Sequence, residues 1–149
     1  MRQVGWFALL GAIVVVLAGC GGGGKEKGGE TEPLNKEAQA ACEGSALSAK
    51  PKLPPSFPQI EADKLTYTQQ RTEGPTEIVE GYFMGSLEDA HNEFKKELQG
   101  AGFKILFDEL EEHDSEVSWG GEGRTGQVAL REQCGEDPKI YVHITNRPE

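Results

Sequence analysis

The sequence has few basic residues for its length. It has 15 lysines and arginines against 25 aspartates and glutamates, so the 149-residue chain carries a formal net charge of −10. A nucleic-acid-binding surface needs clustered Lys and Arg that displace counterions, and adsorption on anionic lipid needs the same. This balance argues against both partners and permits cationic partners or cations. We expect no nucleic-acid partner.

The chain also lacks a long hydrophobic run and a recognisable catalytic motif. Its longest apolar stretch, Val4 to Leu17, has about 14 residues, or ~21 Å of helix, whereas a bilayer core of ~30 Å requires about 20. No nucleophile elbow, zinc-protease motif or kinase-type set occurs. The glycine-rich stretch 120–126 lacks the ending of a phosphate loop and predicts a hairpin turn. The sequence therefore indicates no catalytic residue and no cofactor, and it favours a non-enzymatic role without deciding it.

The N-terminus has the features of an export signal that ends at a cysteine. Arg2 precedes the uncharged apolar run, and residues 17–20 read Leu-Ala-Gly-Cys. This resembles the lipobox of bacterial lipoproteins, which has a leucine, two small residues and a cysteine. The resemblance implies that residues 1–19 are a signal peptide and that Cys20 becomes the lipid-bearing N-terminus, with palmitate-type acyl chains. It implies an anchor in the cell membrane on the extracytoplasmic side, periplasmic or at the cell surface.

The rest of the chain consists of three segments that differ in composition. Residues 20–34 are rich in glycine and charge and hold almost no apolar residue, which predicts a flexible tether. In 35–60, Asn35 is expected to cap a short helix over Lys36–Glu43, followed by a stiff, proline-rich connection. Residues 61–149 are expected to form one α+β domain. Its sequence resembles no family that we recognise.

Alternating apolar and polar residues predict strands at about 65–68, 76–84, 103–110, 117–119, 128–130 and 140–144. One helix is expected after Ser86, which forms a capping box with Asp89. Its apolar face holds Leu87, Ala90, Phe94 and Leu98, and His91 is expected on its exposed side. The order β-β-α-β-β-β-β predicts an antiparallel sheet of about five to six strands with the main helix packed on one face. In the strand 103–110 we expect Phe103, Ile105 and Phe107 on one side.

The two cysteines other than Cys20 are expected to form a disulfide. Exported proteins retain such bonds, and Cys42 with Cys134 closes a loop of about 93 residues, worth roughly 4–5 kcal/mol in the chain-entropy model. A redox-active pair is the alternative, but active pairs usually lie two residues apart.

The densest group of possible metal ligands lies at residues 108–114. If Glu109, Glu111 and His113 lie in a strand, they project from one face, where carboxylates and an imidazole can hold a divalent cation. The alternative is a solvated, acidic hairpin end. A second candidate is a polar-aromatic sheet face with Tyr141 and His143 that binds a ligand or partner. Its expected neighbours are Thr66, Thr68, Ser118, Arg131 and Thr145, and its alternative is an ordinary solvent-facing surface.

These features together predict a lipid-anchored, non-catalytic binding or interaction module of the bacterial cell envelope. Its partners would be the membrane, through lipid on Cys20, and a protein or small molecule of the envelope. One alternative is an envelope hydrolase or metal-binding protein that uses the acidic cluster near His113. Another is a structural accessory subunit of an envelope complex.

Overall fold

The computed structural model describes residues 35–135 and 138–149. Two helices and six strands follow one another along this part of the chain. They are α1 (Lys36–Glu43), β1 (Leu65–Glu73), β2 (Thr76–Met84), α2 (Leu87–Gly100), β3 (Lys104–Leu110), β4 (Asp114–Gly121), β5 (Arg124–Arg131) and β6 (Lys139–Pro148). The predicted α+β class, the antiparallel sheet and the order of elements are confirmed.

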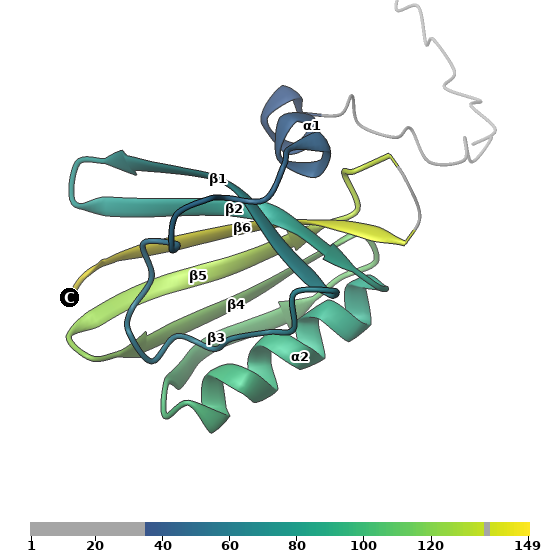
Figure 1. Cartoon of the computed structure of the whole chain (residues 1–149). Coiled ribbons are helices and arrows are strands. Elements are labelled where there is room, and N and C mark those ends of the chain that lie inside the picture. The colour runs from purple at the N-terminus through teal and green to yellow at the C-terminus, as the bar shows by residue number, and fades with distance from the viewer. Residues whose placement is uncertain (1–34, 136–137) are drawn as a thin grey trace, which may run out of the picture. The chain divides into compact units, whose positions relative to one another are not determined.

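All six strands form one antiparallel sheet in the order β1-β2-β6-β5-β4-β3 (Figure 1). β1 and β2 are a hairpin, and β3 to β6 follow one another as neighbours. The last strand, β6, lies between β2 and β5 and joins the two parts of the sheet. β1 and β3 are consequently the two edge strands.

Helix α2 forms where the capping box predicts it. The Asp89 backbone N–H donates to Ser86 Oγ (3.1 Å), and the Ser86 N–H donates to Asp89 Oδ2 (3.4 Å). These bonds satisfy two backbone donors at the helix N-terminus. The helix lies over β3, β4 and β5, and its predicted apolar residues, Leu87, Ala90, Phe94 and Leu98, are all buried.

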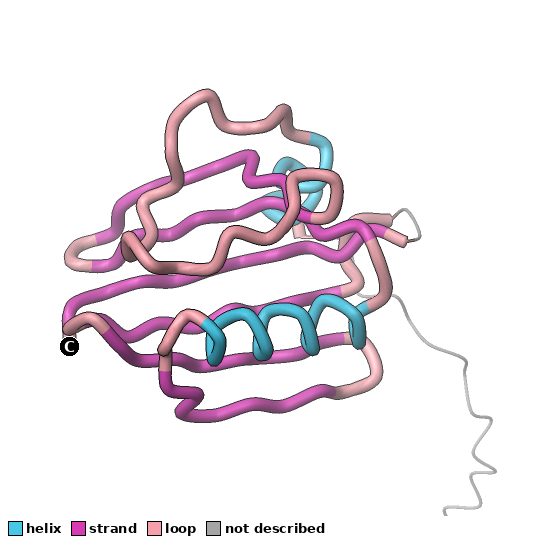
Figure 2. Tube along the Cα trace, turned by 60° about the horizontal axis from the view of Figure 1, so that its bottom comes forward, coloured by secondary structure: helices cyan, strands magenta, loops and turns pink. Residues whose placement is uncertain are grey.

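The main hydrophobic core lies between the sheet and α2, on what we call the α2 face. The rings of Phe57, Phe103 and Trp119 meet there at tilted or edge-on angles, with centroids 5.1–6.2 Å apart. Phe57 belongs to the proline-rich segment 45–64, which Figure 2 shows running across the same face as α2. The predicted stiff connection therefore also covers the core.

Helix α1 covers part of the opposite side of the sheet, the α1 face, over β1, β2 and β6 (Figure 1). Alternation along β6 explains this arrangement. Ile140, Val142 and Ile144 join the core on the α2 face, whereas Tyr141 packs with Ala38 and Ala41 of α1. Neither described helix has the length and apolar character of a membrane-spanning segment.

A bulge in β3 corrects one expectation. Ile105 pairs with Trp119 and Phe107 pairs with Ser118, so Leu106 is an extra residue. The extra residue shifts the alternation, and Phe107 no longer shares the side of Phe103 and Ile105. Phe103 is buried and Ile105 packs against the core, but the Phe107 side chain is exposed.

The glycine-rich stretch is a hairpin turn, as predicted. Glu122 and Gly123 connect β4 to β5 with φ angles of 57° and 69°. Two consecutive positive φ angles are those of a type I′ turn, whose twist matches that of the flanking strands.

Candidate functional site

A buried carboxylate lies on the α1 face of the sheet. Glu80 on β2 has no exposed surface. Its Oε1 accepts a hydrogen bond from the Tyr141 hydroxyl on β6, and its Oε2 pairs with the Arg71 guanidinium on β1. His143 lies directly opposite Glu80 in the β2–β6 register. A buried charge is tolerated only when it is paired and hydrogen-bonded, and both oxygens of Glu80 meet this requirement.

Burial sets the protonation of the groups around Glu80. It raises the pKa of Tyr141, and the hydrogen bond to Glu80 raises it further, so the phenol remains a donor. Burial also lowers the pKa of His143, which favours the neutral imidazole. His143 Nε2 is buried and makes no hydrogen bond within the described residues. Arg71, Glu80 and Tyr141 therefore connect β1, β2 and β6 through their side chains.

The predicted polar-aromatic face exists, but α1 covers part of it. Cross-strand pairs place Thr66, Tyr82, Tyr141 and Arg131 in one row across β1, β2, β6 and β5. Tyr141 is only 3% exposed because α1 packs on its ring. The hydroxyl of Thr68 donates to the Ala41 carbonyl of α1 (2.7 Å). At Tyr141 the face therefore binds a helix of its own chain, where we had expected an outward-facing side chain.

The expected disulfide joins Cys42 and Cys134, with Cα atoms 5.4 Å apart. It connects the C-terminal end of α1 to the segment that follows β5. Lys139 Nζ donates to the Cys42 carbonyl (3.2 Å) beside it. Together with the packing on Tyr141, these contacts fix α1 on the sheet.

His91 corrects a second expectation, because it is 5% exposed and not on the outer side of α2. Its Nδ1 lies 2.6 Å from Ser115 Oγ, and its Nε2 lies 3.7 Å from Asp108 Oδ2, which also pairs with Lys95. Burial lowers the pKa of His91, against an opposing effect of Asp108. His91 lies four residues after Leu87 and three before Phe94, so it belongs to an apolar stripe wider than the one we assigned.

The acidic cluster does not assemble as the metal-site hypothesis requires. β3 ends at Leu110, so Glu111 and His113 lie in the hairpin connection and share no strand face with Glu109. His113 Nδ1 pairs instead with Glu132 Oε2 at 2.9 Å, and this hydrogen bond raises the pKa of the imidazole. Across residues 35–135 and 138–149, no three His, Cys, Asp or Glu side chains are grouped to hold a metal ion. The arrangement agrees with the alternative of an acidic hairpin end.

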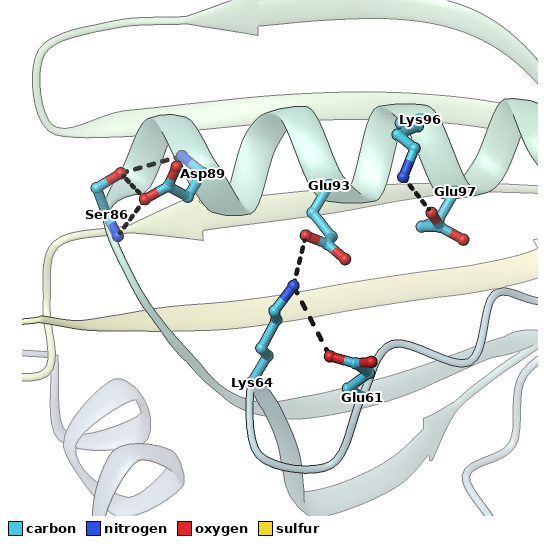
Figure 3. Close-up of polar contacts among 7 residues, drawn as sticks. All are labelled: Glu61, Lys64, Ser86, Asp89, Glu93, Lys96 and Glu97. Atoms are coloured by element: carbon cyan, nitrogen blue, oxygen red, sulfur yellow. Dashed lines mark hydrogen bonds and ion pairs between the residues drawn. The ribbon is translucent and has the colours of Figure 1, made fainter.

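A groove of about 320 Å³ lies beside the N-terminal half of α2. Figure 3 shows that the charges along it pair with one another: Lys64 lies 3.1 Å from Glu93 and 4.0 Å from Glu61. Asp89 is engaged by Ser86 in the capping box, and Lys96 pairs with Glu97. The groove consequently offers little unpaired charge to a ligand.

The edge strand β3 carries the most exposed apolar side chains. Among the described residues, the large hydrophobic side chains that are exposed are Leu106 (54%), Phe107 (49%), Leu110 (44%) and Met84 (40%). Three of these four belong to β3. Natural edge strands usually carry charges, proline or a β-bulge that discourage pairing, and β3 itself has the bulge at Leu106 and the charged residues Lys104, Asp108 and Glu109. In the described chain, the segment after α1 lies along β1, where the Leu47 N–H donates to the Tyr67 carbonyl (2.8 Å), but β3 bonds only to β4.

Two features of the candidate site were not predicted from the sequence, for different reasons. Glu80 lies between the apolar residues Ile78–Val79 and Tyr82–Phe83 of its strand, and a carboxylate within such a run was a signal that pointed to a buried partner. Arg71, across the Gly74 turn, was the matching cation. The exposure of β3 had no sequence signal, because an apolar strand reads the same at an edge and in the centre of a sheet.

No family model, no curated protein and no solved structure matches this chain. Cys20, its lipobox-like context and the tether lie outside the described residues.

Proposed function

We propose that the protein is a lipid-anchored, non-catalytic interaction module of the bacterial cell envelope, held through Cys20. The observation that carries this proposal is the sequence of residues 17–20, Leu-Ala-Gly-Cys, directly after a charge-free run of about 14 apolar residues. A diacylglycerol buries about twice the hydrocarbon of a single acyl chain, so it makes membrane attachment stable.

The Cys42–Cys134 disulfide supports an extracytoplasmic location. Thiols in the cytosol are kept reduced, whereas exported proteins form and keep structural disulfides. The pair is distant in sequence and joins two packed segments, which is typical of a structural bond. Once these two cysteines are bonded, Cys20 is the remaining thiol available for lipid.

The distribution of exposed and buried groups supports an interaction role. Two pairs of side chains most resemble catalytic groups, Glu80 with Tyr141 and His91 with Ser115, and all four of these side chains are buried. The large apolar side chains that are exposed lie mostly on β3. A row of apolar side chains on an unpaired strand is suited to binding another polypeptide.

The test compares the full-length protein with a Cys20→Ser variant in a bacterial host fed an alkyne-tagged palmitate. We expect the unmodified sequence to be labelled, to fractionate with membranes and to lack residues 1–19 by mass spectrometry. Cys20→Ser should lose the label and the membrane association. Gly22→Ala, two residues further on, is the matched control and should behave as the unmodified sequence does. An intact Met1 with an unlabelled Cys20 would overturn the proposal.

A further inference from the structure

The bulge gives β3 an arrangement of side chains that suits pairing with the β3 strand of a second copy. Phe107 pairs with Ser118, and Leu106 is the extra residue before it, so the two side chains lie together on the α1 face. The Leu106 Cδ1 atom lies 3.3 Å from the point where a Cβ on Gly120 would stand. Gly120 follows the core residue Trp119 and therefore faces away from α2, which places Leu106 on the α1 face.

The flanking residues extend the arrangement in both directions. Lys104 and Glu109 lie on the α1 face as well, since their partners on β4 alternate with core residues. Ile105 and Asp108 lie on the α2 face, where Ile105 packs on the core and Asp108 meets Lys95. From Lys104 to Glu109, the side chains therefore lie on the α1, α2, α1, α1, α2 and α1 faces in turn. This order is the same when the strand is followed in the opposite direction.

We propose that the β3 strands of two copies of this chain pair antiparallel about a twofold axis between Leu106 and Phe107, joining the two sheets edge to edge. This inference rests on the proposed interaction role and identifies the partner as a second copy. Leu106 of each copy then lies opposite Phe107 of the other. Four exposed apolar side chains become neighbours, and their removal from water drives the association.

Charge complementarity favours this register. Lys104 lies opposite Glu109 of the second copy, and the twofold axis repeats the pair. Opposite charges directly across a strand pair are stabilising, and like charges are destabilising. A shift of one residue would oppose side chains from different faces of the sheet, and it would lose both ion pairs.

Helix α2 leaves room for the second copy. It contacts β3, β4 and β5, so its axis lies over β4, roughly 7 Å from the twofold axis at the usual strand spacing. The two α2 helices then lie about 14 Å apart, more than the helix diameter of about 10 Å. They do not collide across the junction.

Sedimentation velocity over a wide concentration range tests the pairing. The sample is the chain from Gly21 to Glu149, which contains every contact described above, with its disulfide intact. We expect a reversible monomer–dimer equilibrium. Phe107→Lys should raise the dissociation constant roughly 30-fold or more, as loss of a central apolar contact does. Met84→Lys is the matched control: it changes an exposed apolar side chain away from β3 and should leave the equilibrium unchanged.

A charge exchange tests the register. Lys104→Glu alone places like charges opposite one another at two symmetric positions and should weaken the dimer about 10-fold. Adding Glu109→Lys restores opposite charges and should return the dissociation constant to within about threefold of the original. A doubly exchanged protein as weak as the single variant would overturn this register.

A photo-crosslinking amino acid at position 107 tests the pairing of two copies separately from the proposed interaction role. In cells, we expect a product with the mass of two copies. If the purified chain stays monomeric at every concentration and crosslinks only to other proteins, self-pairing is wrong while the interaction role stands. If lipid labelling of Cys20 fails and the dimer forms, the anchor is wrong and the pairing of β3 stands.

Discussion

The Tyr141 hydroxyl donates a hydrogen bond to Oε1 of Glu80 across the β2–β6 strand pair, and both side chains are almost fully buried. β6 is the strand that joins the two parts of the sheet, so this bond lies at the junction between them. Its loss would leave a buried carboxylate oxygen without a donor, which costs more than the bond itself contributes.

Tyr141→Phe should therefore lower the free energy of unfolding by about 1–3 kcal/mol, as measured by urea denaturation. The matched control is Tyr82→Phe on the paired position of β2, which keeps the ring that Lys139 contacts at 4.6 Å. That change should cost less than about 0.5 kcal/mol. Equal effects of the two substitutions would mean that the Glu80 hydrogen bond contributes nothing specific.

The stability of the domain should decrease as the pH falls below about 6.5. Burial lowers the pKa of His91 and of His143 below their ordinary value of 6.5 in the folded state. The unfolded chain then binds more protons, so the stabilisation is complete above pH 6.5 and is lost as the pH falls through the folded pKa values. Denaturation at about pH 7.5 and about pH 5.5 measures the loss.

His91→Gln and His143→Gln should each reduce this pH dependence. His113→Gln is the informative comparison, because the Glu132 hydrogen bond raises the His113 pKa. Its contribution has the opposite sign: it is present at low pH and is lost as the pH rises through the folded value. An unchanged slope in both the His91 and the His143 variant would contradict the assignment.

Divalent cations should not stabilise the protein. Glu109 lies in β3, whereas Glu111 and His113 lie beyond its end and His113 pairs with Glu132. A ligand that binds only the folded state raises the melting temperature, so EDTA, Ca²⁺ and Zn²⁺ should each shift it by less than about 1 °C. An upward shift that His113→Ala abolishes would restore the metal-site hypothesis.

Removal of the disulfide should free α1 and destabilise the domain. The double change Cys42→Ser and Cys134→Ser should cost roughly 2–5 kcal/mol and expose residues 36–43 to limited proteolysis. Cys20→Ser is the control, because Cys20 contributes nothing to the Cys42–Cys134 bond. Protection of 36–43 equal to that of the intact protein would mean that packing on Tyr141 suffices to hold the helix.

The local elements could be predicted because their signals are local. The Ser86–Asp89 capping box, the Asn35 cap and the alternation through Ile140, Val142 and Ile144 each describe a few consecutive residues, and all three are present. The disulfide followed from an even count once Cys20 was set aside. The face shared by Tyr141, Thr66 and Arg131 followed from the period of two along a strand.

The remaining features depend on contacts between distant segments. No local pattern places β6 between β2 and β5, so neither the cover of α1 over Tyr141 nor the edge position of β3 was visible in the sequence. The bulge at Leu106 reversed the side of Phe107 for the same reason, since pairing with β4 creates it. The burial of His91 was not predicted, because a polar residue is not counted when the apolar stripe of a helix is assigned.

The position of the disulfide also determines how the fold responds to mechanical load. Cys42 and Cys134 are separated by 92 residues, and strands β1 to β5 with α2 all lie between them. When the two chain ends are pulled apart, the tension passes directly from Cys42 to Cys134 through the sulfur bridge. Stretching can therefore extend α1 and peel away β6, while the enclosed strands bear no tension until the bridge is reduced.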